Sequence, residues 1–111
     1  MDCLFCKFIS KEFKTDIIYE NDFVLAFNDI APQAPHHILI VPKKHIASIS
    51  KLEKTDSSFM GELYLAAQEI AKSLNVEDYR LVINNGKGAG QSVFHIHLHL
   101  MAGREFTWPA G

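Results

Sequence analysis

Three of the chain's six histidines lie in the stretch VFHIHLHLM, residues 93–101, where they alternate with aliphatic residues. Successive side chains of a β-strand point to opposite faces. A strand here would therefore place His95, His97 and His99 on one face, about 6–7 Å apart. The aliphatic residues between them would pack on the other face against a helix. An imidazole has an ordinary pKa near ~6.5, so most of these rings are expected to be neutral at pH 7.

The residues alone leave three interpretations of this row open. It could be a polar, half-exposed strand face. It could be a metal centre, because a His-x-His pair can chelate zinc and leave an open position that activates water; the next carboxylate, Glu105, lies beyond the stretch. It could hold a nucleophilic histidine, since a neutral imidazole attacks phosphorus or a carbonyl carbon and then leaves readily.

The loop before the histidines favours phosphorus as the target. Residues 84–92, NNGKGAGQS, contain three glycines, which allow backbone N–H groups to turn inward around an anion. Gln91 and Ser92 add side-chain donors where the predicted strand begins. The stretch is not a Walker A loop, because the Gly-Lys-Ser/Thr ending is absent and a strand follows it. A hairpin turn would explain the loop alone, but its place before the histidines favours a phosphate-binding loop.

Cys3 and Cys6 are the only cysteines and form a C-x-x-C pair. In a reducing compartment such a pair is typical of a metal site or a redox motif, and a disulfide is not expected. A third interpretation is two small buried residues on one helical turn. All three remain open from the pair alone.

Composition indicates one domain of ordinary globular type. The chain has 111 residues, of which 48% are hydrophobic and 22% charged, with a net charge of −2. This charge leaves no electrostatic footprint for nucleic acid or an anionic membrane. No apolar run approaches the roughly 20 residues of a membrane span, and the N-terminal residues lack the pattern of a signal peptide. A cytoplasmic protein is therefore expected.

Periodicity and turn residues predict an α+β fold with an antiparallel sheet backed by a helix. The predicted elements are a short helix over 3–11, strands over 16–21, 22–29 and 37–42, one long helix, and strands over 79–84 and 93–101. The first two strands would meet in a tight turn at residues 21–22. The long helix would begin in a capping box of Ser50 and Glu53, or at Asp56, and end at Asn75.

The segment GQSVFHIHLHLM resembles the signature of the histidine triad (HIT) family, and within it the Hint branch of nucleoside phosphoramidases. The resemblance extends from CLFCKFI through LAFNDIAPQAPHHILIVPKKHI to WPAG, nearly the whole chain. It implies a single HIT domain over 1–111, with a five-stranded antiparallel sheet, one long helix and a short N-terminal helix. It also implies a homodimer that acts on purine nucleotides, with no nucleic-acid or membrane partner.

The resemblance implies a nucleophilic mechanism. His97 would attack the α-phosphorus of a purine nucleoside 5′-phosphoramidate, or of an aminoacyl-adenylate, and form a nucleotidyl-histidine intermediate. His95 would orient His97, whose Nδ1–H would donate to a backbone carbonyl and leave Nε2 free. His99 would contact phosphate oxygens, and Ser92 and His99 are the two candidates to relay a proton to the departing amine. His37 would support the row from behind.

The resemblance also implies a nucleotide site. Asp29 would bind the ribose hydroxyls, although from its own position it is equally a residue that starts a loop. The base pocket would be lined by apolar residues that could also be plain core, namely Leu4, Phe5, Phe8, Phe27 and Ile30. Contacts on the phosphate and leaving-group side would come from Asn84, Gly90, Gln91 and Ser92. Trp108 would reach the active site of the partner subunit.

A structural zinc site is implied by other bacterial members of the family, which hold zinc with a C-x-x-C pair and two histidines. The matching residues are Cys3, Cys6, His45 and His95, a closed set without an open position for catalysis. No cofactor is expected in the reaction itself.

Two functions compete with the phosphoramidase. One is a dinucleoside polyphosphate hydrolase or nucleotidyl transferase of the same superfamily, and the other is a nucleotide-binding regulator without turnover. The Gln91-Ser92 pair and the WPAG ending favour the Hint branch. Phe13-Lys14 stands where the Hint pattern has Ile-Pro, which leaves adenine or guanine preference open.

Overall fold

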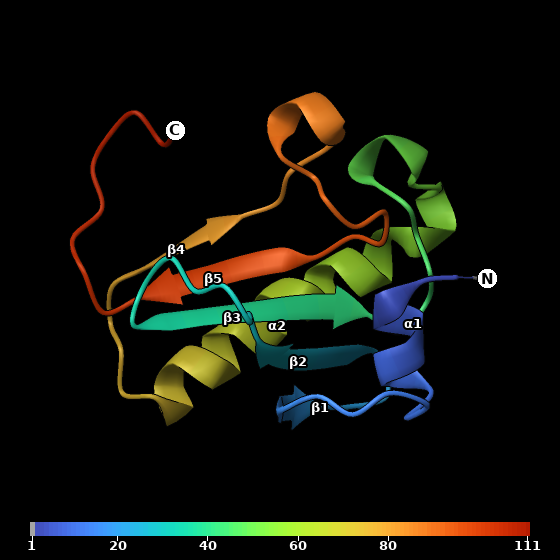
Figure 1. The fold of residues 1–111 in the computed structure, drawn as a ribbon, viewed down its shortest axis with the longest axis horizontal. Helices are drawn as coiled ribbons and strands as arrows, with labels where there is room; N and C mark the ends of the chain where they lie inside the picture. Colours follow the sequence, from blue (N-terminus) through green and yellow to red (C-terminus); the bar gives the residue numbers. More distant parts are fainter. Residues whose placement is uncertain (1) are drawn as a thin grey trace.

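A five-stranded antiparallel sheet forms the centre of the computed structural model, which describes residues 2–111 (Figure 1). The strands lie in the order β1-β2-β3-β5-β4, and each neighbouring pair is antiparallel. Their bounds are β1 Ile17–Glu20, β2 Val24–Asn28, β3 His36–Pro42, β4 Tyr79–Val82 and β5 Leu98–Ala102. The predicted α+β class and five-stranded antiparallel sheet are confirmed.

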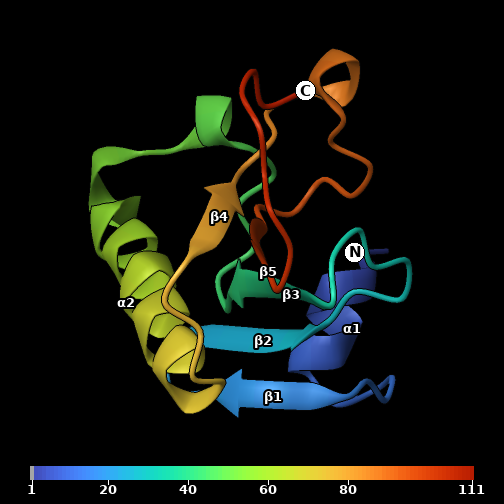
Figure 2. The same cartoon turned by 90° about the vertical axis from the view of Figure 1, so that its left-hand side faces the viewer.

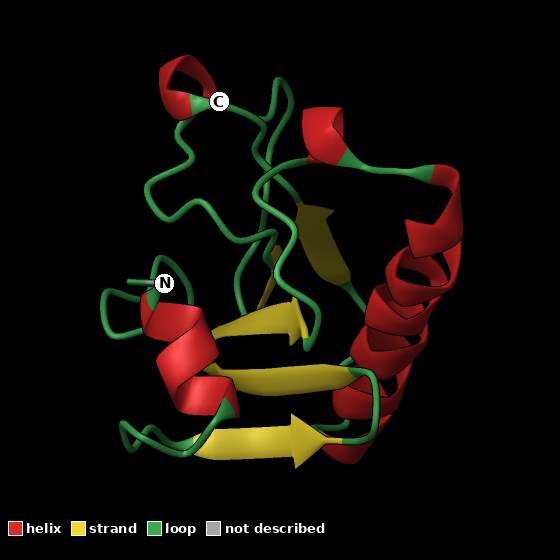
Figure 3. Cartoon of the chain, turned by 90° about the vertical axis from the view of Figure 1, so that its right-hand side faces the viewer, coloured by secondary structure: helices red, strands yellow, loops and turns green. Residues whose placement is uncertain are grey.

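The two α-helices, α1 Leu4–Ile9 and α2 Ser57–Ser73, cover opposite faces of the sheet (Figures 2 and 3). Alternate residues of β2 enter the two resulting cores: Val24 and Ala26 pack in the cluster that contains α2, while Leu25 and Phe27 pack in the cluster that contains α1. Because both faces are covered, the central strands appear as continuous apolar runs. None of the helices within residues 2–111 is long and apolar enough to cross a membrane.

The ends of the elements follow local hydrogen bonds. In the turn between β1 and β2, Asn21 Oδ1 accepts from two backbone N–H groups. Of the two predicted starts for α2, the structure has the one at Asp56, whose Oδ2 accepts from the N–H of Glu53 at 3.0 Å. The predicted capping box of Ser50 and Glu53 is not formed, because the Ser50 hydroxyl pairs with that of Ser48. Asn75, just after α2, adopts a φ of 56°, the left-handed conformation that ends helices.

The last strand is shorter than predicted, because β5 begins at Leu98 and not at residue 93. Its pairing with β3 stops at Leu98 opposite Ile40. Continuing the register would set Ile96 opposite Pro42, which has no N–H to donate to the ladder. The Ile96 N–H donates instead to the carbonyl of Ile46 at 2.8 Å. β4 and α1 are also shorter than predicted.

The alternation of side chains nevertheless continues through the irregular stretch. The aliphatic residues are buried in the cluster beneath α2, and this set consists of Ile96, Leu98 and Leu100. On the other side, the rings of His95 and His97 stand edge-on to Phe5 of α1, at centroid distances of 5.9 and 5.2 Å. The predicted separation of histidine and aliphatic side chains onto opposite faces is therefore present, although residues 93–97 do not pair with β3.

The loop between β2 and β3 packs closely against the segment that follows β5. Gly103 has a φ of +96°, and a Cβ there would lie 2.9 Å from Cβ of Pro35. The Nε–H of Arg104 donates to the carbonyl of Gln33 at 2.9 Å. Only glycine accommodates both this conformation and this approach.

We expect Gly103→Ala to lower the free energy of unfolding by about 1–3 kcal/mol, since it adds both a clash and a strained φ. The matched substitution Gly61→Ala lies within α2 with nothing within 4 Å of the added Cβ. It should raise stability by about 0.5–1 kcal/mol. Urea denaturation of both variants measures the contrast, and equal midpoints would contradict it.

Candidate active site

A pocket of about 230 Å³ opens on the α1 side of the sheet. Its wall combines α1, the end of β2 with the following loop, β3, and the segment that leads into β5. The lining residues are Leu4, Phe5, Phe8, Thr15, Phe27, Asn28, Asp29, Ile30, Leu39, Ser92, Val93, His97 and His99. The structure thus brings together all five predicted base-pocket residues, Asp29, Ser92 and two of the three histidines of the row.

His97 has one ring nitrogen held by the backbone. Its Nδ1 lies 2.8 Å from the carbonyl oxygen of His95. A carbonyl only accepts, so Nδ1 carries the hydrogen and Nε2 of the neutral ring keeps its lone pair. The hydrogen bond predicted for this residue is therefore formed. The arrangement suits nucleophilic attack by Nε2.

The ring of His99 lies next to the ring of His97, with their centroids 5.0 Å apart. Its Nδ1 is 2.9 Å from Nε2 of His37, and the same Nε2 is 3.4 Å from Oδ2 of Asp29. Nε2 of His99 is buried and has no hydrogen-bond partner among residues 2–111. Since His99 lines the pocket, a ligand is the natural partner for this nitrogen.

Burial keeps the rings of His99 and His37 uncharged. It lowers the pKa of His99 to about 4, and the nearby His97 and His37 act in the same direction. Burial also lowers the pKa of His37, while the carboxylate of Asp29 opposes this shift. At pH 7 the His37–His99 pair is therefore neutral.

The four residues predicted to hold zinc come together on the other side of His95. Sγ of Cys3 and Sγ of Cys6 lie 3.4 and 3.7 Å from Nδ1 of His95. Nδ1 of His45 lies 3.4 Å from Sγ of Cys6 and 3.1 Å from Nδ1 of His95. Zinc bonds of about 2.3 Å to sulfur and 2.0–2.1 Å to nitrogen give tetrahedral edges of about 3.3–3.8 Å. The cluster has nearly these dimensions.

The second ring nitrogen of His95 also fits a metal ligand. Its Nε2 lies 2.8 Å from the carbonyl of Pro42, so Nε2 carries the hydrogen and Nδ1 is free to ligate. Burial and the neighbouring Cys3 raise the pKa of the Cys6 thiol to about 11. Such a thiol is a poor nucleophile, which counts against the redox interpretation of the C-x-x-C pair.

A second group of possible ligands, Asp29, His37 and His99, does not suit a metal in the same way. Nδ1 of His37 accepts the backbone N–H of Gln33 at 2.9 Å. A neutral ring that bound a metal through Nε2 would need its hydrogen at Nδ1, facing this N–H. A proton shared with His99 satisfies the contacts better than a cation.

Several predicted nucleotide contacts do not line the pocket. Gln91 is buried, accepts from the N–H of Gly86, and donates both amide hydrogens to the carbonyls of Ala47 and Val93. Its side chain therefore shapes the loop and has no donor left for an anion, contrary to the prediction.

Two other predicted contacts, Asn84 and Gly90, also lie outside the pocket wall. Asn84 lies against Gly90: a Cβ added to this glycine would be 3.6 Å from Nδ2 of Asn84. Trp108 is 85% exposed, and its contact with the active site of a partner subunit stays a prediction.

Sequence reasoning missed four of the lining residues, which are Thr15, Asn28, Leu39 and Val93. One of them could have been found, because Leu39 is directly opposite His99 in the ladder between β3 and β5. The contact of Gln33 with His37 leaves no signal in the sequence, since it uses a backbone group.

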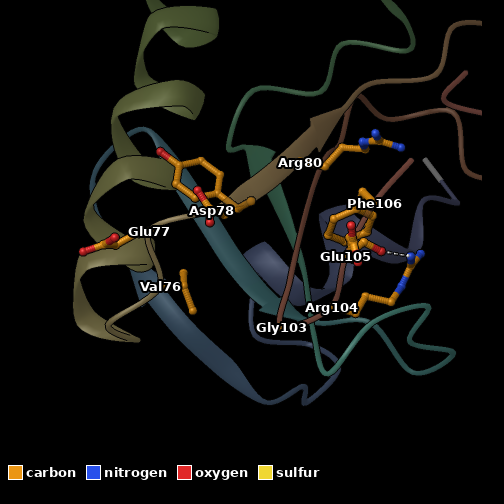
Figure 4. A pocket seen from close by; sticks show the side chains of 9 residues that line it. Val76, Glu77, Asp78, Arg80, Gly103, Arg104, Glu105 and Phe106 are labelled. Atoms are coloured by element: carbon orange, nitrogen blue, oxygen red, sulfur yellow. Dashed lines mark hydrogen bonds between the residues drawn. The ribbon is translucent and has the colours of Figure 1, made fainter. Parts of the chain in front are cut away.

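A larger and more open groove of about 870 Å³ lies along residues 76–80 and 103–106, at the edge of the sheet formed by β4 (Figure 4). The guanidinium groups of Arg80 and Arg104 lie 5.1 and 4.1 Å from the ring centroid of Phe106. No histidine or cysteine lines this groove. The chemistry therefore belongs to the smaller pocket.

The fold and the pocket define an α+β protein with a backbone-oriented histidine facing a small apolar cavity. Comparison with known proteins is consistent with this class. The HIT domain family matches residues 10–106, and the chain belongs to this family.

One relative and two solved structures illustrate the match. The chain is 48% identical to an uncharacterized HIT-like protein of Synechocystis over 99% of this chain and 97% of the relative. It is 46% identical to a HIT family hydrolase from Legionella pneumophila, with a TM-score of 0.95 over 99% of this chain and 100% of the other. A histidine triad protein from Clostridium difficile is 38% identical, with a TM-score of 0.93 over 96% and 95% of the two chains.

The lowered pKa of His99 predicts a pH-dependent stability. Between its folded pKa of about 4 and the ordinary value of 6.5, the unfolded chain binds the proton more tightly. The free energy of unfolding should therefore fall as pH decreases through this window. His99→Asn should reduce the slope of the unfolding free energy against pH. The reduction should be less than the about 1.4 kcal/mol per pH unit that one fully coupled proton gives, because the ring is partly exposed. Urea denaturation between pH 7 and pH 5 measures it, and parallel curves would refute the assignment.

Proposed function

We propose that this HIT-family protein hydrolyses the P–N bond of purine nucleoside 5′-phosphoramidates through a nucleotidyl-histidine intermediate. The observation that carries the proposal is the orientation of His97, whose Nδ1–H is bonded to the carbonyl of His95 at 2.8 Å. This bond leaves the lone pair of Nε2 on a residue that lines the pocket. A neutral imidazole with a free Nε2 is a good nucleophile towards phosphorus and a good leaving group afterwards.

The pocket supports a nucleoside as the bound group. Its wall is largely apolar and aromatic, with Phe5, Phe8 and Phe27 packed at centroid distances of 5.1–6.3 Å. Such a wall suits a planar base. Asp29 accepts one backbone N–H, from Ala31 at 2.8 Å, which leaves lone pairs for the two ribose hydroxyls.

The reaction would proceed in two displacements. Nε2 of His97 attacks the α-phosphorus, the P–N bond to the amine breaks, and the amine nitrogen takes up a proton as it leaves. Water then attacks the same phosphorus and gives up a proton, which balances the one taken up by the amine. The bond from phosphorus to Nε2 breaks, the nucleoside monophosphate is released, and the free imidazole of His97 is regenerated. Hydrogen-bond donors around the phosphoryl oxygens, such as His99 and the glycine-rich loop, would stabilise the developing charge.

We propose zinc as a structural component, held by Cys3, Cys6, His45 and His95. The near-tetrahedral dimensions of the cluster and the hydrogen bond from His95 to Pro42 support this assignment. Four protein ligands leave no open position, so the ion would hold α1 against the segment before β5 without taking part in the reaction.

We further propose that the protein is a homodimer. Support comes from β4, an edge strand of the sheet, and from Trp108, a residue that is 85% exposed. Tryptophan is enriched at protein–protein interfaces relative to the rest of the surface.

The proposed activity predicts release of AMP from an adenosine 5′-phosphoramidate. His97→Ala should lower kcat by about 10⁴-fold or more, because it removes the nucleophile. His36→Asn is the matched control, since it replaces a histidine of β3 that does not line the pocket. Chromatographic measurement of AMP tests both, and mass spectrometry of protein quenched during turnover should map a nucleotidyl adduct to His97.

Other outcomes would identify the competing functions. Tight AMP binding without amine release would indicate a nucleotide-binding regulator. Faster cleavage of diadenosine polyphosphate than of phosphoramidate would indicate the polyphosphate hydrolase or nucleotidyl transferase. Undiminished turnover by His97→Ala would exclude His97 as the nucleophile.

The zinc proposal predicts about one zinc ion per chain by elemental analysis of the purified protein. Cys6→Ser should abolish binding and lower Tm by at least about 5 °C, because one ligand of a closed site is lost. Chelators should lower stability while folded protein keeps its phosphoramidase activity. Zinc-free wild-type protein with the same Tm as the zinc-bound protein would contradict the structural role.

A further inference from the structure

One backbone contact determines where His37 carries its hydrogen. The N–H of Gln33 lies 2.9 Å from Nδ1 of His37. A backbone N–H can only donate, so Nδ1 must present its lone pair. The neutral ring therefore carries its hydrogen on Nε2.

The same reasoning continues to His99. Nε2 of His37 lies 2.9 Å from Nδ1 of His99, and because this Nε2 bears the hydrogen, Nδ1 of His99 accepts it. The neutral ring of His99 then carries its own hydrogen on Nε2. This is the buried nitrogen that has no partner among residues 2–111, on a side chain that lines the pocket.

We infer that the backbone amide of Gln33 is a positioning group that, through His37, makes His99 an uncharged N–H donor to a phosphoryl oxygen of the substrate. The identity of the substrate rests on the proposed function. The placement of the hydrogens rests only on the contacts of Gln33, His37 and His99.

This assignment separates two roles that the sequence leaves shared between Ser92 and His99. In the assigned form His99 has a single ring hydrogen, and losing it to the amine would leave an imidazolate unless His37 passed on its own hydrogen. His37 has no second hydrogen, because its Nδ1 faces an amide that does not ionise. His99 therefore donates a hydrogen bond without transferring the proton. The amine takes its proton from the side of the pocket lined by Ser92, whose exposed hydroxyl can recover a proton from water.

The loop that carries Gln33 is held from outside the pocket. Arg104 donates to the carbonyl of Gln33 at 2.9 Å, and Gly103 allows the close approach of Pro35. Both holding residues belong to the wall of the larger groove (Figure 4). The low pKa of His99 agrees with a ring that stays uncharged.

The first test reads the hydrogens directly. In ¹⁵N-labelled wild-type protein at pH 7, long-range ¹H–¹⁵N correlation should show His37 and His99 with protonated, pyrrole-type Nε2 and unprotonated, pyridine-type Nδ1. A hydrogen on Nδ1 of His99, or on both of its nitrogens, would overturn the inference. This readout needs neither a variant nor turnover.

The second test removes the amide hydrogen. Gln33→Pro has no N–H at this position, whereas the control Gln33→Ala keeps it. The proline variant should show altered ring-nitrogen shifts for His37 and His99, and the alanine variant should retain the wild-type pattern. Wild-type shifts in folded Gln33→Pro would show that the amide is not the determinant.

The third test uses leaving groups of different basicity. His99→Ala should lower kcat by about 10²-fold, by the same factor for alkylamine and nitroaniline phosphoramidates. His99→Gln should restore most of the loss, because its amide supplies an N–H but no transferable proton. A loss in His99→Gln that grows with the basicity of the amine would make His99 the proton donor and overturn the inference. Absence of wild-type turnover would count against the proposed function alone, since the nitrogen shifts still decide the placement of the hydrogens.

Discussion

Backbone groups determine which nitrogen of each imidazole around the pocket carries a hydrogen, and the rest of the site depends on this constraint. The carbonyl of Pro42 accepts a hydrogen bond from the ring N–H of His95, and the carbonyl of His95 accepts one from the ring N–H of His97. The backbone N–H of Gln33 donates to the unprotonated Nδ1 of His37. A backbone carbonyl cannot donate and a backbone N–H cannot accept. The rings therefore have fixed and different chemical properties although they are the same residue type.

His95 belongs to two assemblies at once, and the structure shows how this is compatible with both. Its side chain points to the cysteine–histidine cluster, while its carbonyl orients His97. Different groups of one residue serve the two purposes, so neither competes with the other. A cation in the cluster would hold the His95 ring between Cys3 and Cys6, and through the backbone would steady the hydrogen bond to the nucleophile.

The early end of the ladder between β3 and β5 makes this arrangement available. Pro42 cannot donate to a sheet, and the backbone groups before Leu98 are therefore free of β3. The carbonyl of His95 then accepts from an imidazole, and the N–H of Ile96 binds elsewhere. The irregular stretch still presents alternating faces, because its aliphatic side chains are buried beneath α2. A shorter strand thus preserves the face of histidines and adds a backbone acceptor for His97.

The features that could be predicted from the sequence are those that depend on neighbours along the chain. The apolar period of α2, the left-handed stop at Asn75, the turn at Asn21 and the two faces of the histidine row all follow from local spacing. The spacing of Cys3 and Cys6 likewise restricted the pair to a few interpretations. Local patterns are readable because a side chain's direction repeats with the period of its element.

Tertiary structure alone decided how the polar groups of the site are used. Gln91 was predicted as a donor to the anion, but its amide is taken by backbone carbonyls that the fold brings to it. His37 and His99 are 62 residues apart in sequence and 2.9 Å apart in space. The placement of their hydrogens depends on the amide of Gln33, a group that every residue but proline possesses. Hydrogen bonds require positions within a few tenths of an ångström, and only the packed chain determines those positions.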